Sequence, residues 1–326
     1  MDLKKFGSLF PVSTMTLGGG GLGMLWGKTT FEECVATVHA AVAAGINLLD
    51  LAPRYGDGKA ESVVGEAFGG RLPPGVRLTS KCNLGNAAPD QVERVLRQSI
   101  EASLRRLQRD RLDIFFLHSN VVPEGHAMWN APDVSRLTPL PLFRSRVRPA
   151  FEKLKAEGLI GAWGLTGIGH PDAIIELLAE DPRPGAVQCI ANLLDSAGGL
   201  KFYDEPARPR EVMAAARANG VGVMGIRAVQ AGALTAAIDR DLPADHPEVR
   251  DYALAAGFRA LCAEIGEDPA IVAHRYALGL PIDTLVLGVK NRAELAGCVA
   301  AAEAGPLPAD LVSRIDASAG CGRTVG

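Results

Sequence analysis

Short apolar segments alternate with amphipathic stretches along most of the chain. Each apolar segment is five to seven residues long, which is typical of buried strands, and the stretches between them repeat their apolar residues with the period of a helix. We expect strands at residues 13–17, 46–50, 77–81, 112–118, 161–166, 186–190, 221–226 and 284–289. The regular alternation of strands and helices predicts an α/β fold built on a parallel sheet.

Several residues mark where the helices begin and end. Thr30 and Glu33 form a capping box, residues 90–107 make one long amphipathic stretch, and Pro171 opens another helix. A glycine just past a helix commonly takes the left-handed conformation that ends it. Glycines in such positions are Gly45, Gly158 and Gly220.

Eight strands without a long polar linker favour a single closed (β/α)8 barrel, the TIM barrel fold, over an open doubly wound sheet. We therefore expect residues 1–326 to form one domain, with the active site at the carboxyl ends of the strands. Two segments, 119–145 and 229–249, are longer than ordinary loops. We interpret them as insertions that build the wall of the active site; disordered surface loops are the alternative.

Charge and cysteine content narrow the functional classes. The chain has 34 Lys and Arg residues against 37 Asp and Glu, a net charge of −3 that offers no basic field for a phosphate backbone, so we expect no nucleic-acid partner. The six cysteines include no CxxC pair, which argues against zinc and redox motifs and indicates a reduced, cytoplasmic protein without a bound metal. No apolar run approaches the roughly 20 residues of a membrane span, so neither a membrane partner nor export is expected.

A glycine-rich segment imitates a dinucleotide-binding fingerprint. Residues 18–23, GGGGLG, match GxGxxG after an expected strand, and Asp50 ends the next strand. In a Rossmann unit the third glycine opens the helix, whereas residues 24–29 separate Gly23 from the capping box. A Rossmann dehydrogenase stays an alternative, to be decided by whether Gly23 faces a pyrophosphate or only turns the chain at the barrel mouth. A P-loop is excluded because Leu22 stands at the position of its first glycine.

Four polar residues lie at or near the ends of neighbouring strands. Asp50, Lys81 and His118 end the second, third and fourth strands, and Tyr55 lies in the loop after the second. Singly, each residue has a structural explanation, such as a turn carboxylate or a packed aromatic ring. Together they indicate a site, because the strand ends of a barrel converge on one face.

These four side chains are suited to moving a proton on an oxygen atom. A tyrosine hydroxyl has a pKa of about 10, and a nearby ammonium stabilises its phenolate and lowers that pKa. Asp50 would keep Lys81 charged and in place. A neutral His118 can donate a hydrogen bond to a carbonyl oxygen and orient it beside Tyr55.

At these residues the chain resembles the aldo-keto reductase superfamily, and the similarity covers most of its length. The matching segments are 44–56 (AGINLLDLAPRYG), 60–65 (AESVVG), 104–118 and 158–166 (GLIGAWGLT), with Gln188 and Asn192. The resemblance implies a (β/α)8 barrel that binds a nicotinamide cofactor, NADP or NAD, without a Rossmann domain. It also implies a catalytic tetrad of Asp50, Tyr55, Lys81 and His118, in which Tyr55 donates or accepts the proton.

The resemblance further implies contacts to the nicotinamide end of the cofactor. Thr166 stands where the family usually has a serine that binds the carboxamide, and Gln188 matches the glutamine at the same group. Gly167 replaces the usual asparagine, and Ile226 replaces the aromatic ring that commonly stacks on the nicotinamide. Arg227 can pair with the cofactor pyrophosphate, pair with an acidic substrate, or be a structural residue at the barrel rim.

The adenosine end of the cofactor is implied to lie at residues 288–295, with Gly288, Lys290, Arg292 and Glu294 as its contacts. Backbone N–H groups at the start of a helix there suit a phosphate. Many NADP-preferring members have an arginine where this chain has Glu294, whose carboxylate would repel a 2′-phosphate. Lys290 and Arg292 are near enough in sequence to compensate, so the preference stays open between NAD and NADP.

Residues 164–167 (GLTG) and 184–185 are similar to the sugar-oxidising branch that includes L-galactose and D-threo-aldose dehydrogenases. The implied activity is hydride transfer between nicotinamide and a carbonyl or hydroxyl carbon of a small sugar or aldehyde. We expect Trp26 and Trp129 in the substrate pocket, with core packing as the alternative for Trp26. A non-catalytic, cofactor-sensing regulatory subunit of the same fold is the competing function, and the oligomeric state is left open.

Overall fold

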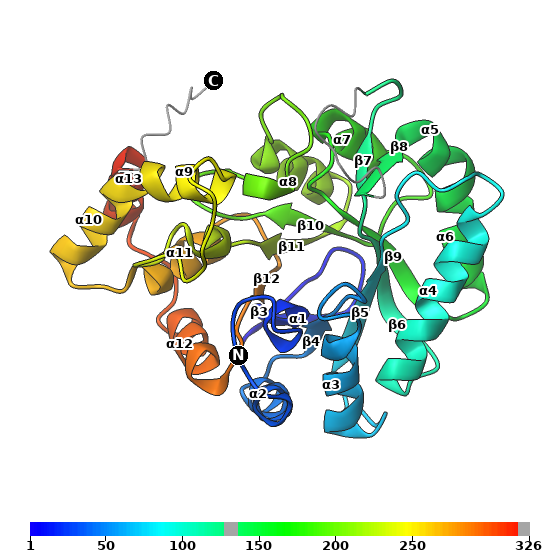
Figure 1. Cartoon of the computed structure of the whole chain (residues 1–326), viewed down its shortest axis with the longest axis horizontal. Coiled ribbons are helices and arrows are strands. Elements are labelled where there is room, and N and C mark those ends of the chain that lie inside the picture. The colour runs from blue at the N-terminus through cyan, green and yellow to red at the C-terminus, as the bar shows by residue number, and fades with distance from the viewer. Residues whose placement is uncertain (127–135, 319–326) are drawn as a thin grey trace.

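The computed structural model describes residues 1–126 and 136–318. Eight parallel strands close into a barrel in the order β3-β4-β5-β6-β9-β10-β11-β12, with β12 paired to β3 (Figure 1). The barrel strands are β3 (Met15–Gly18), β4 (Leu48–Asp50), β5 (Arg77–Cys82), β6 (Leu112–Leu117), β9 (Ile160–Thr166), β10 (Ala186–Ile190), β11 (Gly222–Ile226) and β12 (Thr284–Leu287). This closed barrel confirms the predicted (β/α)8 fold and excludes the open Rossmann sheet.

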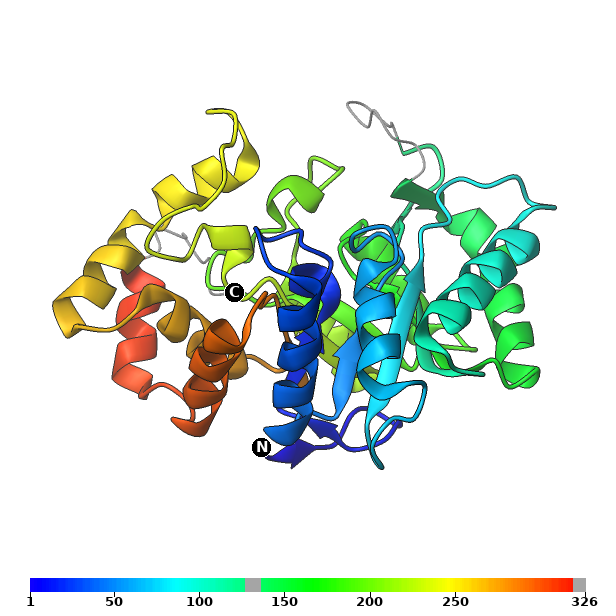
Figure 2. The ribbon, with the colours of Figure 1, turned by 60° about the horizontal axis from the view of Figure 1, so that its bottom comes forward.

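Helices surround the barrel on its outside (Figures 1 and 2). Each lies between two consecutive barrel strands, except the last, which follows β12. These helices are α2 (Phe31–Ala43), α3 (Lys59–Phe68), α4 (Val92–Leu107), α6 (Arg148–Ala156), α7 (Pro171–Ala179), α8 (Pro209–Ala218), α11 (Pro269–Leu278) and α12 (Arg292–Glu303). Among the described residues, no helix is both long and apolar enough to cross a membrane.

A small N-terminal hairpin closes the end of the barrel at which the strands begin (Figure 2). Its strands, β1 (Leu3–Lys4) and β2 (Val12–Ser13), are antiparallel, and the buried Phe6 between them packs against Gly222 at the start of β11. Ser13, expected in the first barrel strand, instead pairs within this hairpin, and the barrel strand begins at Met15. The opposite end of the barrel is left open for a site.

The local sequence signals act as expected at the helix ends. The Thr30 side chain accepts a hydrogen bond from the Glu33 N–H at 3.1 Å and caps α2. The helix predicted over 90–107 begins two residues later than expected, and α7 begins at Pro171. The glycines that follow α2, α6 and α8 all have positive φ; they are Gly45, Gly158 and Gly220.

The segment that resembles the family signature also fixes how α3 packs on α4. A Cβ atom on Gly65 would lie 2.1 Å from the Arg106 carbonyl oxygen, so only glycine allows this approach. The buried Glu61 carboxylate accepts hydrogen bonds from Ser80 at 2.5 Å and from Arg106 at 2.6 Å. These contacts hold α3 and α4 against β5, beside the loop that contains Tyr55.

The first expected insertion, 119–145, is partly regular structure. Its strand β7 (Asn120–Val122) pairs in parallel with β8 (Leu137–Pro139). Its final residues belong to a helical segment, α5 (Leu140–Leu142) and the π-helical turn η2 (Phe143–Val147), that runs into α6. The loop therefore ends earlier than expected, at residue 139. Trp129 lies outside the described residues.

The second expected insertion, 229–249, follows β11 and begins with the short turn η4 (Gln230–Gly232). It ends at residue 246, because α9 (Pro247–Leu254) begins three residues earlier than expected. The remaining helical elements are α1 (Gly19–Leu22), η3 (Gly198–Leu200), α10 (Ala256–Ile265) and α13 (Ala309–Ser318). Within this insertion, residues 229, 231–232, 235, 237 and 239–240 line the cavity at the barrel mouth.

Candidate active site

The four polar residues at the strand ends lie together at the open end of the barrel. Asp50 is the last residue of β4, Lys81 lies near the end of β5, and His118 directly follows β6. The Lys81 Nζ is 5.0 Å from the centroid of the Tyr55 ring. The rings of Tyr55 and His118 meet edge to face, with their centroids 5.8 Å apart and their planes at 89°. Tyr55 and His118 both face the cavity, while Lys81 lies beneath them.

Asp50 and Lys81 form a buried ion pair. The Lys81 Nζ lies 2.9 and 2.8 Å from the two carboxylate oxygens of Asp50, and it donates a third hydrogen bond to the Leu51 carbonyl at 2.8 Å. Thr79 and Gln188 donate to the same Asp50 carboxylate at 2.6 and 2.8 Å. Burial disfavours the charged form of Lys81, but Asp50 and Tyr55 together outweigh this effect, and the pKa of the amine is raised. Lys81 therefore stays protonated and presents an ammonium to Tyr55.

The pKa of Tyr55 departs from the expectation that a nearby ammonium lowers it. Burial raises the pKa of the hydroxyl above its ordinary value of 10. Lys81 lowers this pKa, but by less than burial raises it, and the negative charge of Asp50 adds to the increase. Tyr55 is consequently a protonated donor at neutral pH rather than a phenolate.

His118 is neutral at this site. Burial lowers its pKa well below the ordinary value of 6.5, and the positive charges of Lys81, Arg54 and Arg136 lower it further. Its Nδ1 atom is buried and has no hydrogen-bond partner within the described part of the chain. A neutral imidazole carries one N–H donor, which is the form that can polarise a carbonyl oxygen.

The glycine-rich segment 18–23 turns the chain at the mouth of the barrel. A Cβ atom on Gly23 would lie 2.5 Å from the backbone of Tyr55, and one on Gly21 would lie 1.9 Å from the Val289 carbonyl oxygen. These glycines are needed for close backbone packing, and Gly23 faces the loop that contains Tyr55. Gly23 therefore only turns the chain at the barrel mouth, and the Rossmann interpretation of this motif is wrong.

One cavity of about 790 Å³ opens above the barrel and extends from Tyr55 and His118 to α11 and α12. Its size lies within the range of pockets that hold cofactors and small molecules. Trp26 lines it, with its indole nitrogen beside Gly20 and Gly288. The expected cofactor contacts that also line it are Thr166, Gln188, Arg227, Gly288, Lys290 and Glu294.

Arg292 is the exception among the expected cofactor contacts. It is not among the residues that line the cavity, and its side chain pairs with Glu33 of α2 at 2.9 Å. The Arg292 side chain is 61% exposed, so it lies on the outer surface between α2 and α12. Its placement there depends on a partner 259 positions away, which the local sequence does not reveal.

The nicotinamide-end candidates have partners within the chain. Thr166 ends β9 and donates to the Leu117 carbonyl at 3.0 Å. Gln188 lies in β10 and uses its amide nitrogen to bind Asp50. Gln188 thus links the expected carboxamide site to the Asp50–Lys81 pair, a contact that the sequence did not indicate.

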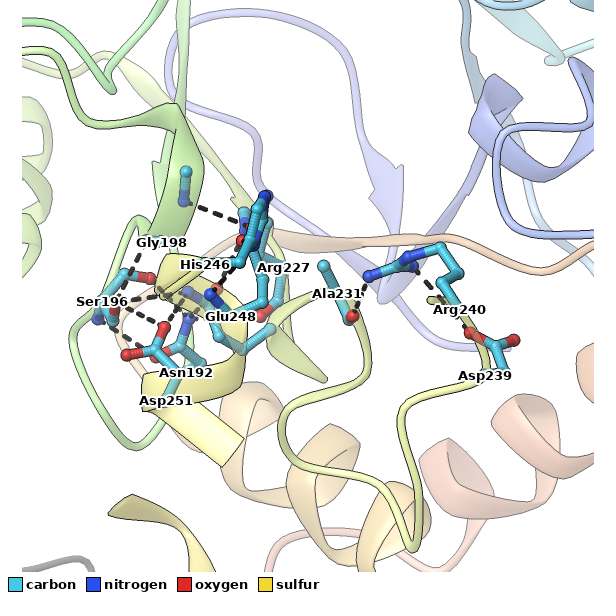
Figure 3. A network of polar contacts seen from close by, with 12 residues as sticks. Asn192, Ser196, Gly198, Arg227, Ala231, Asp239, Arg240, His246, Glu248 and Asp251 are labelled. Atoms are coloured by element: carbon cyan, nitrogen blue, oxygen red, sulfur yellow. Dashed lines mark hydrogen bonds and ion pairs between the residues drawn. The ribbon is translucent and has the colours of Figure 1, made fainter. Parts of the chain in front are cut away.

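Arg227 is held in a buried polar network on the cavity wall (Figure 3). Its guanidinium donates to Glu248 at 2.7 Å and to Gln230 at 2.8 Å, and its backbone is left-handed with φ 61°. Gln230 in turn donates to Asp251 at 2.7 Å. Of the three roles considered for Arg227, a structural role at the barrel rim is the one that these contacts support.

The network continues into the loop after β10, where the Asn192 amide donates to Gln230 and Ser196 donates to Asp251 (Figure 3). It therefore joins this loop, the end of β11 and helix α9. Sequence reasoning singled out Asn192 only as a family match and missed Glu248 and Asp251, which no local pattern connects to Arg227.

The adenosine-end candidates form a pair at the start of α12. The Lys290 Nζ lies 2.5 Å from one Glu294 carboxylate oxygen, and the Lys290 backbone N–H donates to the other at 3.0 Å. Asn291 caps α12 by accepting the Glu294 N–H at 2.9 Å. This end of the cavity therefore holds the ion pair of Lys290 and Glu294 beside the N-terminus of α12.

The comparison with known families agrees with this geometry. The profile of the Aldo/keto reductase family matches residues 14–319. The chain belongs to the aldo/keto reductase family. This aldo/keto reductase is accordingly an NAD(P)-dependent oxidoreductase, as the resemblance implied.

Several characterised relatives and solved structures are similar to this aldo/keto reductase. L-galactose dehydrogenase of Arabidopsis thaliana is 26% identical over 305 residues, which cover 92% of this chain and 88% of that protein. D-threo-aldose 1-dehydrogenase of a Pseudomonas species is 28% identical over 247 residues, 68% of each chain. Glycerol dehydrogenase of Gluconobacter oxydans shares the fold, with a TM-score of 0.70 and 21% identity over 97% of this chain and 94% of that one. The first two match the branch suggested by residues 164–167.

Proposed function

We propose that this aldo/keto reductase moves a hydride between nicotinamide and the carbonyl or hydroxyl carbon of a small sugar or aldehyde, with Tyr55 as the general acid and base. The observation that supports this proposal most directly is the buried Asp50–Lys81 pair beneath the Tyr55 ring, with the neutral His118 beside it. The names of the relatives, which include two sugar dehydrogenases, are consistent with it.

In the direction of reduction, the protonated Tyr55 hydroxyl gives its proton to the carbonyl oxygen of the substrate. The N–H of neutral His118 donates a hydrogen bond to the same oxygen and holds it in place. Proton loss leaves a phenolate, which the Lys81 ammonium stabilises. Asp50 keeps Lys81 charged and fixed, and a nicotinamide cofactor held in the cavity would supply the hydride to the carbonyl carbon.

In the direction of oxidation, the same residues work in reverse. The Tyr55 phenolate accepts the proton of a hydroxyl group, and the carbon that carries this hydroxyl would give its hydride to the oxidised nicotinamide cofactor. When that carbon is the anomeric carbon of an aldose, the product is a lactone.

The cavity extends from Tyr55 to α12, which supports a dinucleotide bound along its length. We assign Thr166 and Gln188 to the nicotinamide carboxamide, and Gly288 and Lys290 to the phosphate and adenosine end, where the N-terminus of α12 favours negative charge. Trp26 forms one wall of the substrate pocket. Because Glu294 neutralises Lys290 and Arg292 lies outside the cavity, we propose that NAD is bound in preference to NADP.

A regulatory subunit with the same fold is the competing function. Potassium-channel β subunits, for example, share this superfamily. No contact in the described part of the chain favours that function, whereas the complete set of acid-base side chains favours catalysis.

The experiment that tests the proposal follows nicotinamide absorbance with NAD, NADP and their reduced forms against a panel of aldoses and small aldehydes. Aldose-dependent reduction of the oxidised cofactor establishes a sugar dehydrogenase, and turnover of aldehydes alone establishes a carbonyl reductase. Cofactor binding without any turnover contradicts the proposal and supports the regulatory subunit.

A further inference from the structure

The substrate end of the cavity is lined by two arginines that the reaction described above does not use. Arg54 directly precedes Tyr55, and Arg136 directly precedes β8, whose Leu137 pairs with Asn120, two residues beyond His118. Both arginines line the cavity, and the positive charges of both lower the pKa of His118. The Arg136 guanidinium also lies over the ring of Phe202, another cavity residue, 5.8 Å from its centroid.

The charges along the cavity are not evenly distributed. Of the described residues that line it, the acidic ones are Asp50, Asp239, Asp268 and Glu294. Asp50 is neutralised by Lys81, and Asp239 lies 3.9 Å from Lys290 just after β12. Asp268 caps α11 and Glu294 lies in α12, the helices on either side of β12. In this eight-stranded barrel β12 is four strands from β6, which His118 follows. The carboxylates of Asp268 and Glu294 therefore lie across the barrel mouth from His118.

Neutral polar groups accompany the two arginines. Asn83 follows β5 and Asn120 begins β7, and both line the cavity. Guanidinium and amide groups are the usual hydrogen-bond donors to a carboxylate. The planar fork of arginine in particular matches the two carboxylate oxygens. Arg54, Arg136 and Asn83 also have interactions within the chain, and the Asn120 amide donates to the Leu200 carbonyl at 3.2 Å. A bound carboxylate would join or replace those interactions.

We propose that the substrates of this enzyme are carbonyl compounds or sugars that carry a carboxylate near the reacting carbon, and that Arg54 and Arg136 bind that carboxylate. This inference rests on the proposed oxidoreductase function and narrows its substrate class. Arg54 reaches the substrate from the rim beside Tyr55, and Arg136 reaches it from the insertion after His118. The two arginines select the substrate, and neither of them donates or accepts the transferred proton.

The test compares para-carboxybenzaldehyde with its methyl ester, which differ chiefly in charge, as substrates for reduction by NADH. We expect the wild-type enzyme to have a kcat/KM at least about tenfold higher for the acid, mainly through KM, as a charge-assisted hydrogen bond predicts. The Arg54→Gln/Arg136→Gln double variant should lose most of this preference while it turns over the ester within about threefold of wild type. Arg144→Gln is the matched control, because Arg144 pairs with Glu176 on the outer surface.

Turnover of the ester shows that each variant is folded and has a working site. An equal kcat/KM for acid and ester in the wild type, or a preference that survives in the double variant, overturns the substrate class and leaves the oxidoreductase function intact. If neither aldehyde is turned over, calorimetric binding of para-(hydroxymethyl)benzoate and its methyl ester to the NAD-loaded protein decides the inference independently. Selective binding of the acid that is lost in the double variant supports it, and equal binding of acid and ester refutes it.

Discussion

The Lys81 Nζ lies 2.8 Å from the nearer carboxylate oxygen of Asp50, and the two side chains are 0% and 3% exposed. Removing one partner of such a pair leaves a charge buried without its counter-ion. Lys81→Met should therefore lower the free energy of unfolding by roughly 3–5 kcal/mol, measured by urea denaturation. The Asp50→Asn/Lys81→Met double variant should recover part of this loss. A loss below about 1 kcal/mol for Lys81→Met would show that the pair is not desolvated as the structure indicates.

The dependence of activity on pH should differ between the two reaction directions. Because burial raises the pKa of Tyr55 above 10, the hydroxyl stays protonated through neutral pH, and reduction should be nearly constant from about pH 6 to about pH 9. Oxidation needs the phenolate and should increase with pH over the same range. The measurement is kcat/KM against pH in each direction. Reduction that falls steeply near neutral pH would contradict a raised pKa for Tyr55.

Glu294 should control the choice between the two cofactors. Glu294→Arg removes the nearer carboxylate partner of Lys290 and adds a cation, so the affinity for NADPH relative to NADH should increase about tenfold or more, measured by fluorescence titration. Arg292→Gln is the control, because Arg292 lies outside the cavity and should leave the ratio unchanged. An unchanged ratio in Glu294→Arg would place this side chain out of reach of the 2′ position.

The Arg227–Glu248 pair should stabilise the junction between β11 and α9. The two side chains are 12% and 6% exposed, so Glu248→Ala leaves the guanidinium poorly solvated and should cost roughly 3 kcal/mol of unfolding free energy. Glu176→Ala breaks an exposed pair with Arg144 and should cost less than about 1 kcal/mol. Equal losses in thermal or chemical unfolding of the two variants would show that the network has no special stabilising role.

The features that the sequence predicted well are those set by neighbouring residues. Each predicted strand corresponds to an observed one, and the positive φ of Gly45 follows from its place after a helix. Ser13 was misplaced because its pairing depends on a hairpin partner, Leu3, rather than on its own apolar neighbours. The local sequence does not show which residues near the strand ends are buried. The raised pKa of Tyr55, which results from burial, could therefore not be predicted.

Contacts between distant positions account for the other differences. Arg292 was expected at the cofactor because of its position beside Lys290, but Glu33 binds it on the outer surface. Gln188 reaches Asp50 across 138 positions, and Arg227 reaches Glu248 from the other end of a long loop. These pairings follow from the closure of the barrel and have no signature in the local pattern.

The most direct test of the account is the Tyr55→Phe variant, with turnover and NADH binding measured on the same preparation. Phenylalanine keeps the ring that packs beside His118 and removes the hydroxyl that exchanges the proton. The account predicts that kcat falls by at least about 10²-fold while the dissociation constant for NADH changes by less than about threefold. Turnover within a few fold of wild type would contradict the assignment of Tyr55 as the general acid and base.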